Sequence, residues 1–251
     1  IQSLNIEYLI NLMKQKINII IPFFNEAGNI LKQLQSILKI IKKQKNYFFK
    51  IILVDDASND GGFELLKNYI NNCKIKNIHL IRNKSNLGKT RSLKKGMKYL
   101  KKENFENFVM FMDGDFQDNP RDIPKFLKMI SNNYDLVIGK QQKNYNLIVK
   151  ISSKIYKLIL RLSLKINLDT PSPQFLIVKF KFIKNFSFIK NYHRYIALYS
   201  IFNGAKYREI DVQYLKRKYG KSKFSKLKIF SAFFEIIYFI YMLKIKKINK
   251  K

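Results

Sequence analysis

Apolar runs that alternate with stretches of helical spacing are the feature that most constrains the fold of this chain. Short continuous apolar runs lie at residues 17–22, 51–54, 78–81, 108–112 and 136–138. The segments between them carry apolar residues every three or four positions, at 27–43, 63–72, 90–102 and 123–131. Runs of this length predict buried strands, and the intervening periodicity predicts helices. Together they predict an α/β fold in which a mostly parallel sheet lies between helices.

The second half of the chain is less regular. Residues 147–164 predict a long amphipathic helix, 169–174 a loop with two prolines, and 207–215 a further strand. Residues 224–243 are strongly apolar and lie between lysine clusters, which predicts a last helix.

We expect one sheet-and-helix domain at residues 17–222. An extension at 1–16 precedes it, and a basic, apolar helix at 223–251 follows it. With 251 residues and 47% hydrophobic content, the chain is large enough for one core. Its single cysteine, Cys73, excludes an intramolecular disulfide framework and a multi-cysteine zinc site.

The chain is strongly basic, with 49 Lys and Arg against 17 Asp and Glu and a formal net charge of +32. Such an excess is typical of proteins that bind nucleic acid or an anionic membrane, but a compositional bias toward lysine on solvated faces explains it equally well. The aromatic residues lie mostly within apolar runs, unlike a stacking platform for single strands. We therefore expect anionic lipids and phosphates as partners and no nucleic acid. A basic nucleic-acid-binding protein remains the alternative from a different class.

The scarce acidic residues gather where predicted strands end. They follow the first, second and fourth strands, in the runs PFFNE at 22–26, DDASND at 55–60 and DGDFQD at 113–118. In parallel sheets, ligands bind at the carboxyl ends of the strands. The sequence therefore predicts a binding site at this edge of the sheet.

The run after the fourth strand predicts a metal site. Gly114 relaxes the backbone so that Asp113 and Asp115 can present carboxylates to one side, and the amide oxygen of Gln117 could add a third ligand. Hard oxygen ligands suit Mg²⁺ or Mn²⁺, and a small protein ligand set leaves positions open for a diphosphate. The alternative is a cluster that only caps a turn and a helix.

Two further acidic residues are candidates for contact with a nucleotide. Asp56 could accept hydrogen bonds from a base or ribose, as acidic residues do at strand ends of nucleotide-binding folds. Glu26 could contact the nucleotide as well. The alternatives are helix capping for Asp56 and stabilisation by the helix dipole for Glu26.

The runs IIIPFFNEAGNI, ILVDDASNDGG, RNKSNLGKTRSLKKGM and FMDGDFQDNPRDIPKFL resemble the family 2 glycosyltransferases, which have the GT-A fold. Within that family, the chain most resembles the dolichol-phosphate mannosyltransferase and polyprenyl-phosphate glycosyltransferase branch. The run DGDFQDNP is the most specific match, and HRYIAL and LKRKYGKSKF match later in the chain. The resemblance covers about residues 17–230 and is more specific for the fold than for the acceptor.

The resemblance assigns roles to further residues. It implies an inverting, metal-dependent hexosyltransferase that takes its sugar from a donor of the GDP-mannose or UDP-glucose type. The full set of residues expected to bind the nucleotide sugar includes some that are already named above. It consists of Pro22, Phe24, Glu26, Val54, Asp56, Asp113, Gly114, Arg91, Ser222 and Lys223. Arg217, Ser222 and Lys223 match a basic loop expected near phosphates, and the alternative is a solvated basic run. His193 and Arg194 match an H-R pair, although His193 could equally be a packed structural residue.

The acceptor side is where the chain departs from the family pattern. Many family members carry an arginine where this chain has Leu176. This difference affects the acceptor side and leaves the donor motifs intact. A lipid phosphate is already ionised and needs no base, whereas a glycan hydroxyl needs one within hydrogen-bond reach. Asp118 is the candidate base, and Asp115, Asp118 and Arg217 are the candidate catalytic residues. We expect a polyprenyl or dolichyl phosphate acceptor, with a glycan hydroxyl in cell-surface polysaccharide synthesis as the alternative.

The C-terminal helix supports a membrane location. Its apolar run at 229–243 is shorter than the ~20 residues that a span requires, Glu235 interrupts it, and lysines flank it. Such a helix is typical of the membrane interface, and the alternative is a core helix packed on the sheet. We therefore expect peripheral attachment at the cytoplasmic face of a membrane, by this helix or through a membrane-anchoring partner protein.

Overall fold

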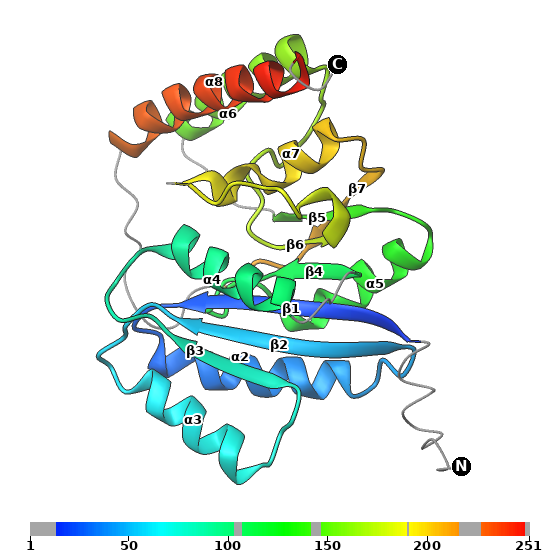
Figure 1. The fold of residues 1–251 in the computed structure, drawn as a ribbon. Helices are drawn as coiled ribbons and strands as arrows, with labels where there is room; N and C mark the ends of the chain where they lie inside the picture. The colour runs from blue at the N-terminus through cyan, green and yellow to red at the C-terminus, as the bar shows by residue number, and fades with distance from the viewer. Residues whose placement is uncertain (1–13, 103–106, 142–146, 190, 216–226, 249–251) are drawn as a thin grey trace.

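A computed structural model of the chain describes residues 14–102, 107–141, 147–189, 191–215 and 227–248. Its centre is a seven-stranded sheet with helices on both faces (Figure 1). The strands are β1 (Gln15–Phe23), β2 (Tyr47–Asp55), β3 (Ile78–Arg82), β4 (Phe108–Phe111), β5 (Leu136–Gln141), β6 (Leu176–Lys179) and β7 (Tyr207–Val212). The α-helices are α2 (Ala27–Ile41), α3 (Gly62–Asn72), α4 (Lys89–Lys102), α5 (Ile123–Ser131), α6 (Leu147–Leu164), α7 (Ile196–Phe202) and α8 (Leu227–Ile248). Short 3₁₀ turns are η1 (Pro120–Asp122), η2 (Phe180–Phe182) and η3 (Tyr192–Tyr195).

The strand order is β3-β2-β1-β4-β6-β5-β7. Strands β1 to β4 run parallel, with Ile19 opposite Ile51 on one side and opposite Met110 on the other. Strand β6 runs antiparallel to both of its neighbours, β4 and β5, while β7 is parallel to β5. The carboxyl ends of β1, β2 and β4 therefore meet at one edge, as the sequence predicted.

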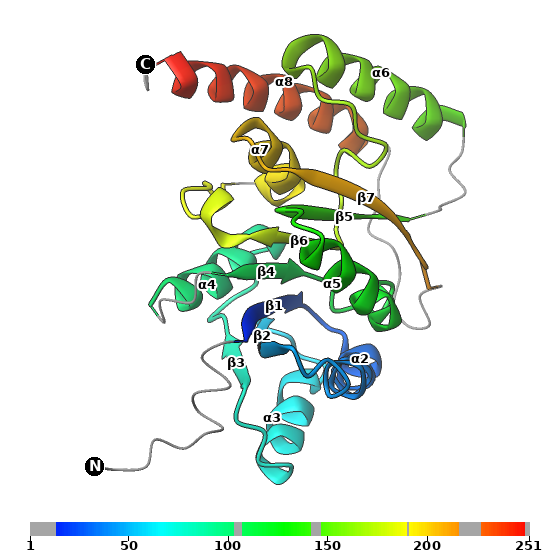
Figure 2. The ribbon, with the colours of Figure 1, turned by 90° about the vertical axis from the view of Figure 1, so that its right-hand side faces the viewer.

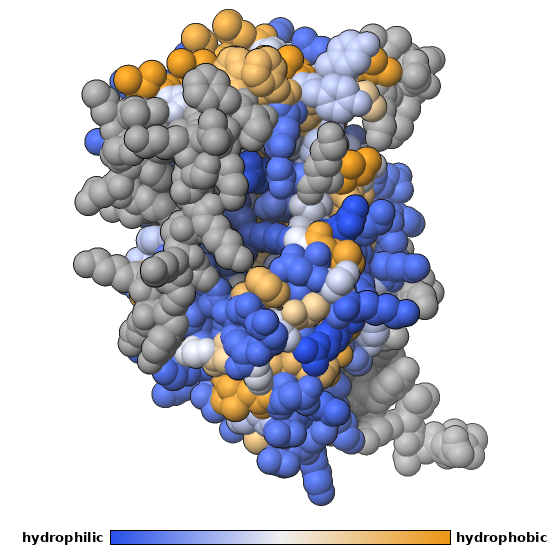
Figure 3. All heavy atoms as spheres, turned by 90° about the vertical axis from the view of Figure 1, so that its left-hand side faces the viewer, coloured by the Kyte–Doolittle hydropathy of each residue, from blue (hydrophilic) through white to orange (hydrophobic). Residues whose placement is uncertain are grey.

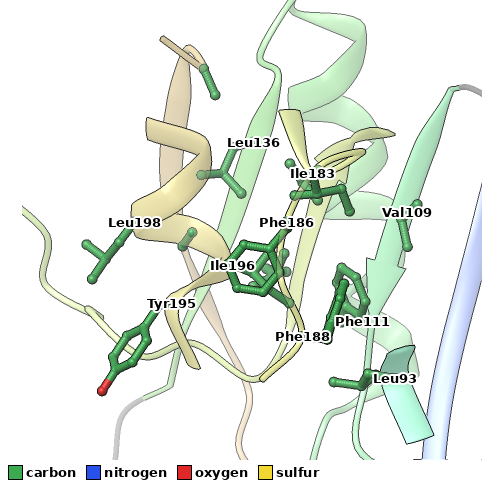
Figure 4. Close-up of a cluster of buried hydrophobic side chains, with 14 of the residues drawn as sticks. Leu93, Val109, Phe111, Leu136, Ile183, Phe186, Phe188, Tyr195, Ile196 and Leu198 are labelled. Atoms are coloured by element: carbon green, nitrogen blue, oxygen red, sulfur yellow. The ribbon is translucent and has the colours of Figure 1, made fainter. Parts of the chain in front are cut away.

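Helices cover both faces of the sheet (Figure 2), and two layers of apolar side chains lie between them and the strands. Side chains of α2, α3 and α5 pack on one face, with residues such as Leu34 and Phe126 fully buried. The other face packs against α4, α7 and the segment around Phe186 and Phe188 (Figure 4). Alternate residues of β1 point to the two layers, with Ile19 in the first and Ile20 in the second. A strand buried on both faces reads as a continuous apolar run, which is why the sequence revealed it.

Helices α6 and α8 lie side by side as an outer layer beyond α7 (Figures 1 and 2). They reach the core through a few inward side chains, including Leu160, Ile236 and Phe239. Phe239 stacks on Tyr195, with ring centroids 4.6 Å apart. Of the helices in the described ranges, none is both long and apolar enough to cross a membrane.

The structure confirms the expected α/β architecture and corrects it in the second half. Strand β6 falls where only an unassigned stretch after the proline loop was expected, and it makes the sheet mixed. Helix α7 was also not predicted. Strand β1 begins at Gln15, two residues before the expected domain boundary. Most of the expected 1–16 extension, and the start of the expected C-terminal segment at 223–226, lie outside the described residues.

Candidate functional site

The loops that follow β1 and β2 are held together by hydrogen bonds. The backbone N–H of Asn25 donates to Ser58 Oγ at 2.9 Å, and that of Asn59 donates to Asn25 Oδ1 at 3.0 Å. The N–H of Ala27, at the start of α2, donates to Asp60 Oδ2 at 2.7 Å. Asn25 has a positive φ of 55°, a conformation that asparagine tolerates better than most residues. These contacts fix the carboxyl edge of the first two strands as one unit.

Asp56 organises the loop between β3 and α4. Its Oδ1 accepts hydrogen bonds from Asn83 Nδ2 at 2.7 Å, from the backbone N–H of Leu87 at 2.9 Å and from Ser92 Oγ at 3.1 Å. Its Oδ2 accepts the N–H of Gly88 at 2.7 Å. Asp56 is 4% exposed, and both of its oxygens are engaged within the protein. The structure therefore places this carboxylate under the loop that leads into α4.

The turn after β4 presents Asp113 and Asp115 at the same edge. Gln33 Nε2 donates to the backbone carbonyl of Asp113 at 2.6 Å, and Asp115 Oδ1 accepts the N–H of Gln117 at 3.1 Å. Gly114 passes so close to β1 that a Cβ there would lie 2.6 Å from the Cβ of Phe23. The turn is thus pressed against the end of the first strand, a position that only glycine allows.

Asp118 lies behind this turn with 1% exposure. Its Oδ2 accepts the backbone N–H of Asp113 at 2.8 Å, and its Oδ1 accepts Gln141 Nε2 at 2.7 Å. Burial, followed by the negative charge of Asp113, raises the pKa of Asp118 to about 7. The carboxyl group braces the turn from inside the protein and does not open onto the surface.

Lys89, the first residue of α4, supplies the positive charge beside the turn. Its Nζ donates hydrogen bonds to Asp113 Oδ1 and to Gln174 Oε1. The two partners come from the turn after β4 and from the loop before β6, so the ammonium joins three segments. Lys89 and Asp113 are each a little over a quarter exposed.

A small pocket opens beside Lys89 and Asp113. The described residues that line it are Lys89, Leu93, Phe111, Met112, Asp113, Pro173, Gln174, Leu176, His193 and Ile196. His193 Nδ1 and Thr90 Oγ1 lie 2.7 Å apart, which links η3 to the start of α4. Burial, followed by the charges of Lys89 and Arg194, lowers the pKa of His193 well below its usual value. Asp56 is not among the residues that line this pocket.

The acidic turn fits a divalent cation in its chemistry. Asp113 and Asp115 offer carboxylate oxygens from one turn, separated by Gly114, and Asp113 already accepts a hydrogen bond from a cation, the Lys89 ammonium. No group of three or more His, Cys, Asp or Glu within the described ranges could hold a metal ion.

The structure brings together only part of the predicted site. Pro22 and Val54 lie opposite each other at the ends of β1 and β2, buried in the sheet, and Phe24, which follows, is half-buried. Glu26 is 7% exposed and accepts a hydrogen bond from Asn29 Nδ2 at 2.6 Å. Arg91 is exposed on α4.

The basic loop lies outside the described residues, including Arg217, Ser222 and Lys223. The chain that leads into it is described. The backbone N–H of Leu215 donates to the carbonyl of Gln117 at 3.0 Å. Tyr214 and Asp118 form an isolated antiparallel β-bridge through their backbones. The chain therefore passes directly beside the acidic turn before residue 216.

The sequence did not indicate Lys89 or Gln174 as site residues. In the segment that contains Lys89, it predicted Arg91 as the phosphate candidate. A lysine at the start of a helix opposes the helix dipole, and this unfavourable placement was the available signal. Gln174 gave no comparable signal, because its position depends on how β6 enters the sheet. Leu176, which stands where many family members carry an arginine, is 1% exposed and lies opposite Phe111 at the end of β4.

Comparison with known proteins identifies a family and a fold. Residues 18–191 match the family model described as "Glycosyl transferase family 2". An uncharacterised protein of Methanocaldococcus jannaschii is 39% identical over 121 residues, which cover 48% of this chain and 49% of that protein. An undecaprenyl-phosphate 4-deoxy-4-formamido-L-arabinose transferase of Pseudomonas savastanoi is 28% identical over 48% of this chain and 34% of its own length. The chain thus spans half or less of these relatives. A dodecaprenyl-phosphate galacturonate synthase of Rhizobium johnstonii is 20% identical over 92% of this chain and 68% of its own length.

Solved structures share the fold. A mannosyltransferase of Pyrobaculum calidifontis, in complex with GDP-Man and Mn²⁺, has a TM-score of 0.60 at 15% identity, over 83% of this chain and 59% of that one. A glucosyl-3-phosphoglycerate synthase of Mycobacterium tuberculosis, in complex with Mn²⁺, UDP-glucose and phosphoglyceric acid, has a TM-score of 0.62 at 15% identity, over 88% and 78% of the two chains. The arrangement described above is the GT-A fold.

Proposed function

Because the chain belongs to glycosyl transferase family 2, we propose that it moves a hexosyl group from a nucleotide sugar to a polyprenyl or dolichyl phosphate, with inversion at the anomeric carbon. The observation that carries this proposal is the turn at 113–115, where two carboxylates lie at the carboxyl edge of the sheet beside the ammonium of Lys89. The names of relatives that act on undecaprenyl or dodecaprenyl phosphates support the choice of acceptor.

The donor diphosphate would lie at this turn. Asp113 and Asp115, with Gln117, would hold Mg²⁺ or Mn²⁺, and a bound divalent ion supplies Lewis-acid stabilisation of the departing diphosphate. Lys89 adds a cation that can bind phosphate oxygens, and Gly114 keeps the turn close to β1. Arg217, Ser222 and Lys223, which lie outside the described residues, are proposed to bind the phosphates as the sequence resemblance implies. The GDP-mannose and UDP-glucose complexes of structural neighbours support a donor of either type.

The position of Asp118 favours an acceptor that is already ionised. A general base must reach the proton that it removes. The Asp118 carboxyl is enclosed, and both of its oxygens accept hydrogen bonds from within the protein. We therefore propose that Asp118 positions the turn and transfers no proton. A lipid phosphate needs only to be held and oriented, which this site could do without a base.

The outer surface of α6 and α8 provides a means of reaching a lipid acceptor. Four exposed apolar residues form a stripe along α6, namely Ile151, Ile155, Leu158 and Leu162. A second stripe along α8 consists of Phe234, Ile237, Tyr238 and Tyr241. Apolar surface gathers over these helices in the view onto the carboxyl edge, above hydrophilic surface (Figure 3). We call these eight residues the apolar roof.

Basic residues accompany the apolar roof, and the acidic residue of α8 turns away from it. Lys150, Lys154 and Arg161 are exposed on α6, and Lys244 is exposed on α8. Glu235 Oε1 accepts a hydrogen bond from Asn191 Nδ2 at 2.9 Å, so this carboxylate points inward to η3. Apolar faces flanked by Lys and Arg favour the interface of anionic membranes. We propose peripheral attachment by this surface at the cytoplasmic face, with a membrane-anchoring partner protein as a second possible route.

Transfer to a lipid phosphate can be measured directly. The purified chain is incubated with Mn²⁺, vesicles that contain undecaprenyl or dolichyl phosphate, and radiolabelled GDP-mannose or UDP-glucose. Label should enter the organic-solvent extract with wild-type protein and not with Asp115→Asn. Glu64→Gln, which removes an exposed carboxylate from α3, should behave as wild type. Label that appears only in water-soluble glycan would reject the lipid acceptor in favour of a glycan hydroxyl.

A further inference from the structure

Lys89 has an unusual position for a helix-terminal lysine. The positive end of a helix dipole disfavours a cation in the first turn, and α4 has no acidic residue there to offset it. Lys89 is nevertheless the residue whose ammonium binds Asp113 Oδ1 and Gln174 Oε1. The Asp113 carboxylate and the Gln174 amide oxygen thus hold a cation that the protein itself supplies.

The residues on both sides of Lys89 are fixed. Before it, the N–H groups of Leu87 and Gly88 donate to the buried carboxylate of Asp56 at 2.9 and 2.7 Å. After it, Thr90 is 5% exposed and its Oγ1 lies 2.7 Å from His193 Nδ1. The backbone at Lys89 is therefore held, and only the flexible side chain can move between partners.

A divalent ion and Lys89 compete for the same carboxylate. A carboxylate that already pairs with an ammonium is a weaker ligand for a second cation. An ammonium and a divalent ion that contact the same carboxylate also repel each other. A nucleoside diphosphate changes the balance, because its negatively charged oxygens offer Lys89 a new partner and help to hold the ion. We propose that the Lys89 ammonium pairs with the Asp113 carboxylate until the donor diphosphate binds. Lys89 then pairs with the diphosphate instead, which frees Asp113 for the divalent ion, so that the ion and the donor bind together. This inference rests on the proposed function and concerns the order in which its ligands assemble.

Metal binding without turnover tests the proposal. Free Mn²⁺ is followed by electron paramagnetic resonance while each protein is titrated with Mn²⁺ alone, or in the presence of GDP or UDP. Wild type should bind Mn²⁺ weakly alone and at least about tenfold more tightly with GDP or UDP, a coupling in the usual range for linked sites. By reciprocity, Mn²⁺ should tighten binding of that nucleotide by the same factor.

Removing the ammonium should uncouple the two ligands. Lys89→Met is expected to bind Mn²⁺ alone about tenfold more tightly than wild type and to lose most of the gain that the nucleotide produces. Lys89→Arg keeps the charge and should retain weak binding of Mn²⁺ alone. Lys94→Met removes an exposed lysine from the same helix and should match wild type. Lys89→Gln serves as a second neutral variant if the methionine variant does not fold by circular dichroism.

Two results would overturn the inference. Lys89→Met and Lys89→Gln could bind Mn²⁺ alone no more tightly than wild type, or Lys94→Met could tighten binding equally, which would indicate a general effect of net charge. Failure of the proposed function looks different. In that case wild type would bind neither GDP nor UDP in the presence of Mn²⁺, whatever the variants do with Mn²⁺ alone.

Discussion

At the scale of single residues, the site depends on side chains that hold the backbone in place. Asp56 and Asp118 are buried carboxylates whose oxygens accept backbone N–H groups from the loop before α4 and from the turn after β4. The sequence predicted that both lie at the site but assigned them contact with substrate. Residue type and position after a strand could be read from the sequence. The direction in which each carboxylate points depends on loops that close over it, and local sequence does not encode this.

Gly114 is the residue whose size matters most at the turn. An alanine Cβ would lie 2.6 Å from the Cβ of Phe23 and 3.0 Å from the carbonyl oxygen of Pro22, so the turn must move. We expect Gly114→Ala to lower the free energy of unfolding by about 1 to 3 kcal/mol, in the range of overpacked sites, and to weaken binding of Mn²⁺ with GDP or UDP. Urea unfolding and calorimetric titration measure the two effects.

Asp115→Asn is the comparison for this variant. It leaves the backbone of the turn unchanged and should weaken metal binding with little loss of stability. A Gly114→Ala protein with wild-type stability and binding would show that the turn has room for a methyl group.

His193 should make stability fall at acidic pH. Its folded-state pKa lies below the usual value of 6.5, since burial and the charges of Lys89 and Arg194 disfavour the imidazolium. The unfolded chain therefore takes up the proton first, and the stability that neutral His193 contributes is lost as pH falls below about 6.5. The free energy of unfolding of wild type should fall more steeply between pH 7 and pH 5 than that of His193→Gln, by at most about 1.4 kcal/mol per pH unit.

Chemical unfolding at a series of pH values measures this difference. His79→Gln, which removes the imidazole of β3, is the control for loss of a histidine. Parallel curves for wild type and His193→Gln would contradict the prediction.

At the scale of elements, the sequence predicted the first half of the sheet well because burial on both faces gives continuous apolar runs. Strands β1 to β4 and helices α2 to α5 lie within a few residues of their expected bounds. Strand β6 escaped prediction, since its four residues follow a loop with two prolines and pair only with strands distant in sequence. Helix α7 has seven residues, too few for a clear helical period. Long elements carry their own pattern, whereas short ones are defined by their neighbours.

The apolar roof should decide whether the protein binds membranes. Leu162 is 75% exposed and Phe234 is 70% exposed, so neither contributes much to the core. The double variant Leu162→Glu, Phe234→Glu should cosediment with vesicles of phosphatidylcholine and phosphatidylglycerol roughly tenfold less than wild type, because it loses two apolar anchors and gains negative charge.

Leu65→Glu is the matched control for the vesicle experiment. Leu65 is 40% exposed on α3, at the opposite end of the molecule from the roof (Figure 1). Its variant should bind vesicles as wild type does. Equal binding by the double variant would exclude the roof as the attachment surface.

At the scale of the whole molecule, strand order brings the distant parts of the site together. The carboxyl ends of β1, β2 and β4 lie at one edge, and α4 crosses above them to deliver Lys89. The fold class and this edge were predicted from the alternation of elements and the rule for parallel sheets. The antiparallel insertion of β6 and the place of η3 beside α4 were not, because both are set by contacts across more than sixty residues of chain.

Ligand binding should stabilise the whole domain only when the acidic turn is complete. GDP- or UDP-sugars with Mn²⁺ should raise the Tm by about 5 to 10 °C at roughly 100 times the Kd, and either ligand alone should raise it much less. Differential scanning fluorimetry measures the shift. Asp113→Asn is the control and should show little response to the pair. Equal stabilisation by nucleotide sugar with EDTA would contradict metal dependence.

The reversed direction of β6 has a consequence for how such a protein can change. Because Leu176 at the start of β6 lies opposite Phe111 at the end of β4, the segment that enters β6 arrives at the same rim where β4 leaves. The part of this connection at 171–174 can therefore lengthen, shorten or exchange side chains such as Gln174 while strands β1 to β4 stay as they are, whereas Phe175 is held in the core. One wall of the pocket is free to diversify, and the other remains fixed by the sheet.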